Sequence, residues 1–194
     1  KLFDIPDKRK VHTGAIPRLG GISFAPTILF SLSFVSAISY IGYIYGYEVP
    51  RGMLTYIIPE FYLLVCGIIL LYLAGIKDDL VGMHYTTKFL IQLIAASLLP
   101  LSGLWINNLY GLFGIQELIP WIGIPLTILT IIFITNAINL IDGIDGLASG
   151  LSGSALLILG SLFLLNKMWM YTMLAFATLG VLIPFFYYNV FGQA

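Results

Sequence analysis

Residues 119–148 read IPWIGIPLTILTIIFITNAINLIDGIDGLA, an apolar run followed directly by a polar motif. The motif spaces two asparagines and two aspartates at successive steps of three and puts a glycine after each aspartate: Asn136, Asn139, Asp142, Asp145, Gly143 and Gly146. An acidic group at the centre of a bilayer costs about 2.5–3.5 kcal/mol on insertion scales. We therefore expect these groups at a membrane edge or in a watered cavity that faces one aqueous side.

The composition is that of a membrane protein. Of the 194 residues, 59% are apolar and 9% are charged, and the mean hydropathy is +0.99, whereas a soluble domain carries about 25% charged residues. We predict a polytopic membrane protein. Nothing in the composition suggests nucleic-acid binding, which would need a basic patch. The single cysteine, Cys66, excludes a disulfide framework, and we expect it to be buried as a small hydrophobic residue.

Apolar runs long enough to span a bilayer recur along the chain. They predict an all-α protein, a single membrane domain over residues 1–194 with about six transmembrane helices. The predicted spans are residues 22–45, 56–76, 88–105, 119–138, 148–166 and 170–188. Residues 103–120 are expected to form a loop with an interfacial piece. The chain starts at a lysine and ends as it leaves an apolar segment, so we expect a fragment of a larger helical bundle, with sequence missing at both ends.

Six alternating spans sort the charged residues between the two sides of the membrane. One side receives the loops 1–21, 77–87, 139–147 and 189–194, and the other receives 46–55, 106–118 and 167–169. Most of the basic residues fall on or beside the first side: Lys1, Lys8, Arg9, Lys10, Arg18, Lys77 and Lys88. The positive-inside rule makes that side cytoplasmic. Every aspartate lies there too, so we predict that the active surface faces the cytosol.

A second acidic pair, Asp78 and Asp79, follows Lys77 at the inner end of the second span. Adjacent carboxylates repel each other unless a cation lies near them. Mg²⁺ suits such a site, because it keeps several waters and bridges a few carboxylates to substrate phosphates. The alternative is a pair of membrane-edge acids that Lys77 neutralises.

Polar side chains follow this pair along the chain. Thr86 or Thr87 is expected to cap the third span, which would put Lys88 and Gln92 on one helical face. Lys88 is either a contact to a phosphate or a snorkelling anchor. His84 fits a loop histidine better than a metal ligand.

The two ends of the chain add further candidates. Residues 8–21, KRKVHTGAIPRLGG, are basic and end in Gly20 and Gly21, which would let an anionic substrate or a lipid headgroup approach the backbone closely. Such a segment is also a common topology determinant. Near the last residue, Asn189 follows Tyr187 and Tyr188, which are typical of an interfacial aromatic belt.

Three of these stretches together resemble the polyprenyl-phosphate N-acetylhexosamine-1-phosphate transferases, glycosyltransferase family 4. The stretches are HTGAIPRLGG at 12–21, GIKDD at 75–79 and NAINLIDGIDGLA at 136–148. The residues around Pro17 and Asp142 resemble the N-acetylglucosamine-1-phosphate branch of the family more than the branch that transfers the muramoyl pentapeptide of peptidoglycan. The resemblance implies an integral membrane enzyme of about ten or eleven helices. Such an enzyme transfers a sugar 1-phosphate from a UDP-sugar to a polyprenyl phosphate such as undecaprenyl phosphate, at the start of cell-envelope polysaccharide synthesis.

Carried over position by position, the resemblance implies a set of site residues. The catalytic candidates are Asp78, Asp79, Asp142 and Asp145, with Asp79 and Asp142 as ligands of Mg²⁺, which Mn²⁺ could replace. The substrate-binding candidates are His12, Gly20, Gly21, Lys88, Asn136, Asn139, Gly143 and Asn189. A Gly-Asp-x-Gly-Ser motif of the family, whose aspartate binds the metal, would lie beyond Ala194.

The resemblance also implies a location and a mechanism. We expect a bacterial inner-membrane protein with a cytoplasmic active face, and a homodimer is compatible with it. A phosphate monoester is mostly dianionic at neutral pH, because its second pKa is about 6. The lipid phosphate therefore needs relief from charge repulsion more than deprotonation, and direct attack on the β-phosphate of the UDP-sugar would release UMP.

Other classes of membrane protein remain as alternatives. A transporter or channel could line an ion site with the same aspartates, but broken helices or inverted repeats are not evident. A prenyltransferase would need an Asp-Asp-x-x-Asp motif, and Gly82 stands where its last aspartate belongs. A CDP-alcohol phosphotransferase would need an arginine shortly after Gly146, where the sequence reads Leu-Ala-Ser.

Overall fold

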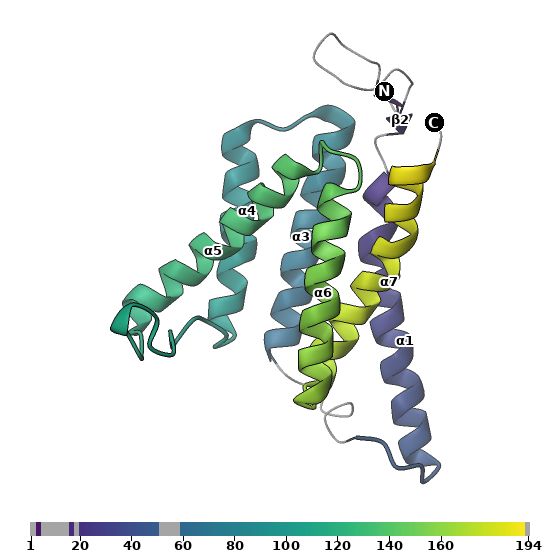
Figure 1. Cartoon of the computed structure of the whole chain (residues 1–194), viewed down its shortest axis with the longest axis vertical. Helices are drawn as coiled ribbons and strands as arrows, with labels where there is room; N and C mark the ends of the chain where they lie inside the picture. Colours follow the sequence, from purple (N-terminus) through teal and green to yellow (C-terminus); the bar gives the residue numbers. More distant parts are fainter. Residues whose placement is uncertain (1–2, 5–15, 18–19, 51–58, 193–194) are drawn as a thin grey trace. The chain divides into compact units, whose positions relative to one another are not determined.

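The computed structural model describes residues 3–4, 16–17, 20–50 and 59–192, and their architecture is helical (Figure 1). Long helices form wherever an apolar run of about 20 residues can satisfy its backbone hydrogen bonds internally. The main helices are α1 (Phe24–Ile44), α3 (Pro59–Val81), α4 (Tyr85–Leu101), α5 (Pro120–Ile141), α6 (Leu147–Leu165) and α7 (Trp169–Phe191). The short elements are β1 (Phe3–Asp4), β2 (Ile16–Pro17) and two 3-10 helices, η1 (Gly20–Ser23) and η2 (Leu112–Gly114). Strands β1 and β2 pair antiparallel, with Phe3 opposite Pro17.

In the part of the chain that the structure describes, five helices are long and apolar enough to cross a membrane: α1 with part of η1, α3, α5, α6 and α7. Helix α4 is apolar but has only 17 residues. The prediction of a polytopic all-α membrane protein is confirmed, and the third of the six expected spans is the short one.

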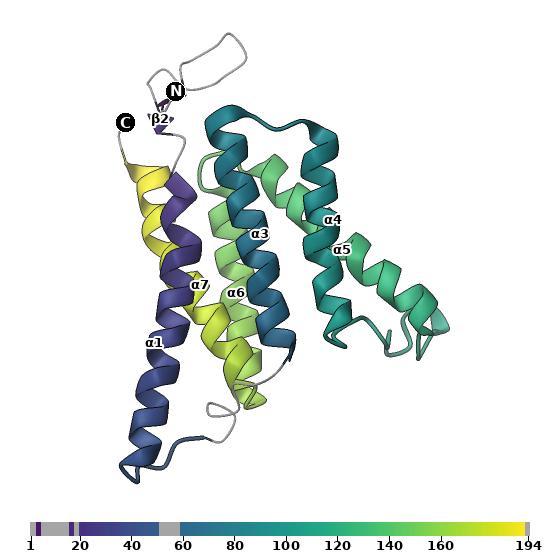
Figure 2. The same cartoon turned by 180° about the vertical axis from the view of Figure 1, so that it is seen from behind.

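The helices group into two compact units, one formed by Lys1–Tyr56 with Leu140–Ala194 and the other by Ile57–Asn139. In the first unit, α7 lies between α6 and α1 (Figures 1 and 2). A methyl group on Gly160 of α6 would lie 3.2 Å from Ala175 of α7, and the rings of Phe24 and Phe185 meet edge to face at 5.1 Å between α1 and α7. Small residues let these helices approach closely, as is usual in membranes.

In the second unit, α3 and α4 run antiparallel and side by side, joined by a short turn at 82–84 (Figure 2). Gly67 of α3 faces the backbone of α4, because a Cβ there would lie 3.3 Å from the carbonyl oxygen of Ala95. Helix α5 runs obliquely to α4. At its first turns the hydroxyl of Thr127 accepts the amide of Ile106 at 2.9 Å and donates to the Gly123 carbonyl at 2.7 Å.

Residues 103–120 were expected to be a loop with an interfacial piece, and they form a hairpin-like connection. Asn108 and Glu117 form an antiparallel bridge, η2 lies at the tip, and the Leu118 amide donates to the Asn107 carbonyl at 2.8 Å. The ring of Trp105 covers Gly123, where a side chain would have no room.

Several helices extend further than the apolar runs predict. Helix α3 continues to Val81, α5 to Ile141 and α7 to Phe191. Hydropathy marks the thickness of the hydrocarbon layer, whereas the backbone hydrogen bonds of a helix can continue through the interface until a capping residue stops them. The expected loops at 77–87, 139–147 and 189–194 are therefore wrong in their bounds, and the polar residues at their starts lie in last helical turns.

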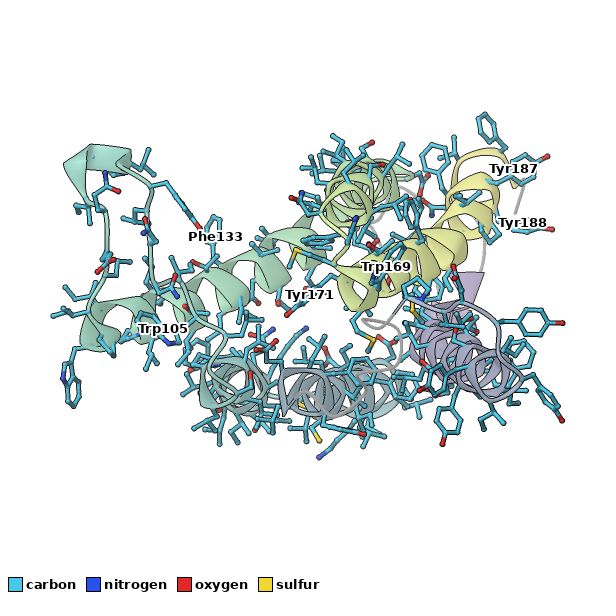
Figure 3. The ribbon with its side chains drawn as sticks, turned by 90° about the horizontal axis from the view of Figure 1, so that it is seen from below. Trp105, Phe133, Trp169, Tyr171, Tyr187 and Tyr188 are labelled. Carbon is cyan, nitrogen blue, oxygen red and sulfur yellow. The ribbon has the colours of Figure 1, made fainter. Side chains whose placement is uncertain are left out.

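Two side-chain expectations can be compared with the structure. Cys66 is exposed on α3 rather than buried, and it is a free thiol. Tyr187 and Tyr188 are exposed and point outward from the end of α7 (Figure 3), as side chains of an aromatic belt do.

Candidate functional site

The turn between α3 and α4 is built around the side chain of Asp78. Gly82 ends the helix in a left-handed conformation, with φ of 80°, and its amide donates to the Asp78 carbonyl at 2.8 Å. Such a C-terminal glycine is a common helix stop, because it has no Cβ to clash. The side-chain Oδ1 of Asp78 then accepts the amide of Met83 at 2.9 Å. Asp78 therefore holds the turn that follows its own helix.

The second carboxylate oxygen of Asp78 binds Lys88. The Lys88 Nζ lies 2.9 Å from Asp78 Oδ2, and the two side chains are 36% and 29% exposed. Lys88, and not the adjacent Lys77, is thus the cation that balances this carboxylate. An ammonium has three hydrogens to donate, so Lys88 can bind Asp78 and still offer a donor to an anionic ligand.

Neighbouring polar groups lie at the same end of the unit. Asp79 is exposed in the last turn of α3. His84 is the residue that precedes the first turn of α4, and its Nδ1 lies 2.7 Å from the hydroxyl of Thr86. The expectation that Thr86 or Thr87 caps this helix is wrong by two residues or more, because the helix begins at Tyr85.

A reciprocal amide pair connects α4 to α5. Asn136 Nδ2 donates to Gln92 Oε1 at 3.0 Å, and Gln92 Nε2 donates to Asn136 Oδ1 at 3.3 Å. Asn136 Nδ2 also donates to the carbonyl of Ile132 at 2.8 Å. One turn further along α5, Asn139 is exposed. The two asparagines of the motif therefore have different surroundings, one engaged between helices and one open.

The aspartates of the motif lie on a turn that leads into α6. Asp142 and Asp145 are both exposed, and the turn is closed by the Ile144 amide donating to the Ile141 carbonyl at 3.1 Å. Gly146 is the residue before α6 and has φ of 73°. A Cβ at Gly146 would run into Val190 and lie 3.2 Å from the ring of Phe186.

Asn189 of α7 holds this turn in place. Its Oδ1 accepts a short hydrogen bond from the amide of Gly146, which is buried. That amide is one of those which a helix N-terminus leaves without an internal partner. Gly143, by contrast, has nothing closer to an added Cβ than the Leu140 carbonyl at 4.0 Å. Sterics require a glycine at 146, and leave 143 with open space.

The predicted site residues thus fall into two sets. The second unit brings together Asp78 and Lys88 and places Asn136 against Gln92, while the first unit brings Asn189 to the turn that carries Asp142 and Asp145. Gly20 opens η1, and Gly21 has no atom within 4 Å of an added Cβ. His12 lies outside the described residues. The pairing of Asp79 with Asp142 at one metal stays a prediction.

The donor chemistry of the described residues fits Mg²⁺. No group of three His, Cys, Asp or Glu side chains gathers within residues 20–50 and 59–192. Mg²⁺ does not need such a group, since it is commonly bound by one or two carboxylates together with water and substrate phosphates. Asp79, Asp142 and Asp145 present exposed carboxylates, which are hard oxygen donors of the kind that Mg²⁺ prefers.

The sequence does not predict two contacts of this site, the one between Gln92 and Asn136 and the one between Asp78 and the Met83 amide. Gln92 is expected on the face of Lys88, but its partner lies 44 residues away. The only sequence signal is a lone amide in an apolar helix, and such a group needs a hydrogen-bond partner when buried. The contact between the Met83 amide and Asp78 has no sequence signal, because a backbone amide is not specific to any residue type.

Comparison with known proteins identifies the family to which the chain is similar. The family model described as glycosyl transferase family 4 matches residues 61–194. A probable undecaprenyl-phosphate N-acetylglucosaminyl 1-phosphate transferase of Bacillus subtilis is 32% identical over 77% of this chain and 37% of its own length. The undecaprenyl-phosphate alpha-N-acetylglucosaminyl 1-phosphate transferase of Salmonella typhi is 30% identical over 97% of this chain and 47% of its own length.

A decaprenyl-phosphate N-acetylglucosaminephosphotransferase of Mycobacterium leprae is 33% identical over 75% of this chain and 35% of its own length. The chain thus spans less than half the length of these relatives. No solved structure matches it significantly. The matched region contains both acidic motifs, at 78–79 and 136–146, and it covers more than half of the chain. The chain therefore belongs to glycosyl transferase family 4.

Proposed function

We propose that this chain is part of a transferase that moves N-acetylglucosamine 1-phosphate from its UDP conjugate to a polyprenyl phosphate, releasing UMP. The observation that carries the proposal is that the family match includes both acidic motifs, and that the relatives are named as transferases of this sugar phosphate to undecaprenyl or decaprenyl phosphate. The reaction would begin assembly of a cell-envelope polysaccharide.

We place the active face on the cytoplasmic side of a bacterial inner membrane. The support is the distribution of charge, since most Lys and Arg residues and all aspartates fall on one predicted side. A UDP-sugar is a cytosolic metabolite that cannot cross a bilayer unaided, because burying its charges in hydrocarbon is costly. Exposed aspartates at helix ends suit a site that a soluble donor reaches from water.

Lys88 provides a positive charge that is held at the end of α3. The Asp78 carboxylate orients the Lys88 ammonium from one side, and the remaining ammonium hydrogens can bind a phosphate oxygen. A charge held in place before the reaction stabilises the charge that develops in phosphoryl transfer more than a mobile one does. Asp78 acts here by positioning, since the lipid phosphate is already dianionic near neutral pH.

Asp79 and Asp142 are the residues that would hold Mg²⁺. When bound, the ion would neutralise negative charge on the pyrophosphate of the donor. The turn that carries Asp142 and Asp145 is tied to α7 by the hydrogen bond between Asn189 and the Gly146 amide. The open space at Gly143 would let a phosphate or ribose approach that turn closely.

The proposal is tested with the full-length gene product in membranes or detergent. The assay follows labelled UMP into UDP-N-acetylglucosamine in the presence of Mg²⁺ and undecaprenyl phosphate. We expect exchange with this donor and little with a UDP-muramoyl peptide. A protein that exchanges only the muramoyl donor would overturn the choice of sugar, and one that exchanges neither would overturn the transferase assignment. Ion flux through vesicles that contain it would favour the transporter alternative.

A further inference from the structure

Gln92 is a buried amide in the middle of an apolar helix, and the proposed reaction gives it no task. The residue is 7% exposed. An amide in such a place is costly unless its hydrogen bonds are made. Both hydrogen bonds of its side chain join it to one residue, Asn136 of α5. Gln92 therefore joins two helices of the second unit through a single polar contact.

Asn136 has no donor left for a ligand. A side-chain amide carries two N–H hydrogens. One hydrogen of Asn136 Nδ2 goes to Gln92 Oε1 at 3.0 Å and the other to the Ile132 carbonyl at 2.8 Å. The Ile132 carbonyl can only accept, so it fixes which end of the Asn136 amide carries the nitrogen. The oxygen end then faces Gln92 Nε2. The first asparagine of the motif is thus occupied within the protein.

The same face of α4 also holds the end of α3. Lys88 lies one turn before Gln92, and residues four apart share a helical face. Lys88 binds Asp78 of α3, while Gln92 binds Asn136 of α5. One face of α4 therefore fixes two helix ends, and each of these ends carries a further polar residue that is exposed, Asp79 on α3 and Asn139 on α5.

We propose that Gln92 is a positioning residue that locks α5 through Asn136, so that Asn139, one turn further along, is presented to the substrate. We call the hydrogen-bonded pair of Gln92 and Asn136 the lock. In this arrangement Asn139 is the contact to the nucleotide-sugar. The inference rests on the proposed function for the identity of that substrate. The lock itself rests on the amide pair alone.

A side-chain swap tests the lock. Gln92→Asn shortens one side of the pair by a methylene, Asn136→Gln lengthens the other by the same amount, and the double variant restores the total length. In the full-length enzyme we expect each single change to raise the KM for the UDP-sugar on the order of tenfold, with a smaller change in kcat. We expect the double variant to return to within about twofold of wild type.

Asn139→Gln supplies the matched control, since it makes the same chemical change one turn away. Its defect should persist when it is combined with Gln92→Asn. A silent Gln92→Asn would overturn the proposal, and so would a double variant that keeps the full defect of Asn136→Gln, because Asn136 would then touch the substrate itself.

Thermal unfolding in detergent separates this inference from the proposed function. The lock predicts that the effects of Gln92→Asn and Asn136→Gln on the midpoint are strongly non-additive, whereas those of Gln92→Asn and Asn139→Gln add. This coupling needs no substrate. A wild-type protein without exchange activity would overturn only the proposed function, and additive effects at 92 and 136 would overturn only the lock.

Discussion

The carboxylate of Asp78 binds two partners, the amide of Met83 within the turn at 2.9 Å and the ammonium of Lys88 in the first turn of α4 at 2.9 Å. One residue thus joins the turn that follows α3 to the first turn of α4. Because these side chains are partly exposed, the ion pair itself should stabilise the fold by only about 0.2–1 kcal/mol. Its larger effect is to orient the lysine.

Replacing Asp78 distinguishes positioning from proton transfer. Asp78→Asn keeps an oxygen for the Met83 amide but loses the acceptor that orients Lys88. We expect the full-length enzyme to keep part of its rate, reduced by a similar factor at pH 7 and pH 8, because the lipid phosphate is already mostly dianionic and needs little deprotonation. Asp78→Ala removes both contacts and should cost more in rate and in thermal stability. Complete loss of activity in Asp78→Asn at every pH would contradict this role.

The two glycines of the turn at 142–146 should respond differently to the same change. Gly146→Ala forces an alanine into a left-handed conformation and against Val190, so we expect a loss of at least about 1–2 kcal/mol in stability. Gly143→Ala meets only the Leu140 carbonyl at 4.0 Å and should leave the thermal midpoint nearly unchanged.

Activity measurements complete the comparison between Gly143 and Gly146. If the open space at Gly143 serves substrate approach, Gly143→Ala should raise the KM for the UDP-sugar while the protein stays folded. A Gly143→Ala enzyme with wild-type KM would remove this position from the substrate site.

We expect Asn189→Asp to keep the stability of the protein and Asn189→Ala to lower it. Asn189→Ala leaves the buried amide of Gly146 without its acceptor, which costs about 1–3 kcal/mol. Asn189→Asp keeps an acceptor oxygen for the Gly146 amide. Its negative charge is favoured by the start of α6 and disfavoured by the end of α7, so the two dipole effects offset each other. Thermal midpoints in detergent check both changes. If Asn189→Asp is as unstable as Asn189→Ala, the cap does not depend on this oxygen.

Metal dependence checks the role of the exposed aspartates. We expect a chelator to abolish exchange in the full-length enzyme, and Mg²⁺ or Mn²⁺ to restore it. Asp79→Asn should raise the Mg²⁺ concentration needed for half-maximal rate, because a carboxylate ligand is lost. Glu60→Gln, at the opposite end of the same helix, serves as the control and should leave that concentration unchanged. Activity that survives the chelator would contradict a metal-dependent reaction.

The sequence predicts the number and class of the helices well, since apolar runs of 20 residues leave the backbone few alternatives in a membrane. It predicts their ends less well. Asp78, Asn139 and Asn189 look like loop residues because they are polar, yet each lies in the last turns of a helix. The stop depends on a capping residue such as Gly82, whose left-handed backbone no hydropathy pattern reveals.

The candidate site is only partly readable from the sequence for a similar reason. Residue types and spacing point to Asp78 and Lys88, and the structure pairs them. The bond between Gln92 and Asn136 depends on how α5 crosses α4, which is a property of the packed helices and not of either segment. Sequence reasoning therefore treats Asn136 and Asn139 as equivalent, although only one of them has its amide hydrogens engaged.

The shortness of α4 has a consequence for the lipid around it. Seventeen residues rise about 26 Å at ~1.5 Å per residue, less than the hydrocarbon thickness of about 30 Å. Exposed side chains such as Phe89 and Leu93 give this helix an apolar outer surface. Where that surface meets lipid, we expect hydrophobic mismatch to thin the bilayer locally. A membrane that dips beside Lys88 would bring the headgroup of a long-chain lipid closer to the level of the acidic pair.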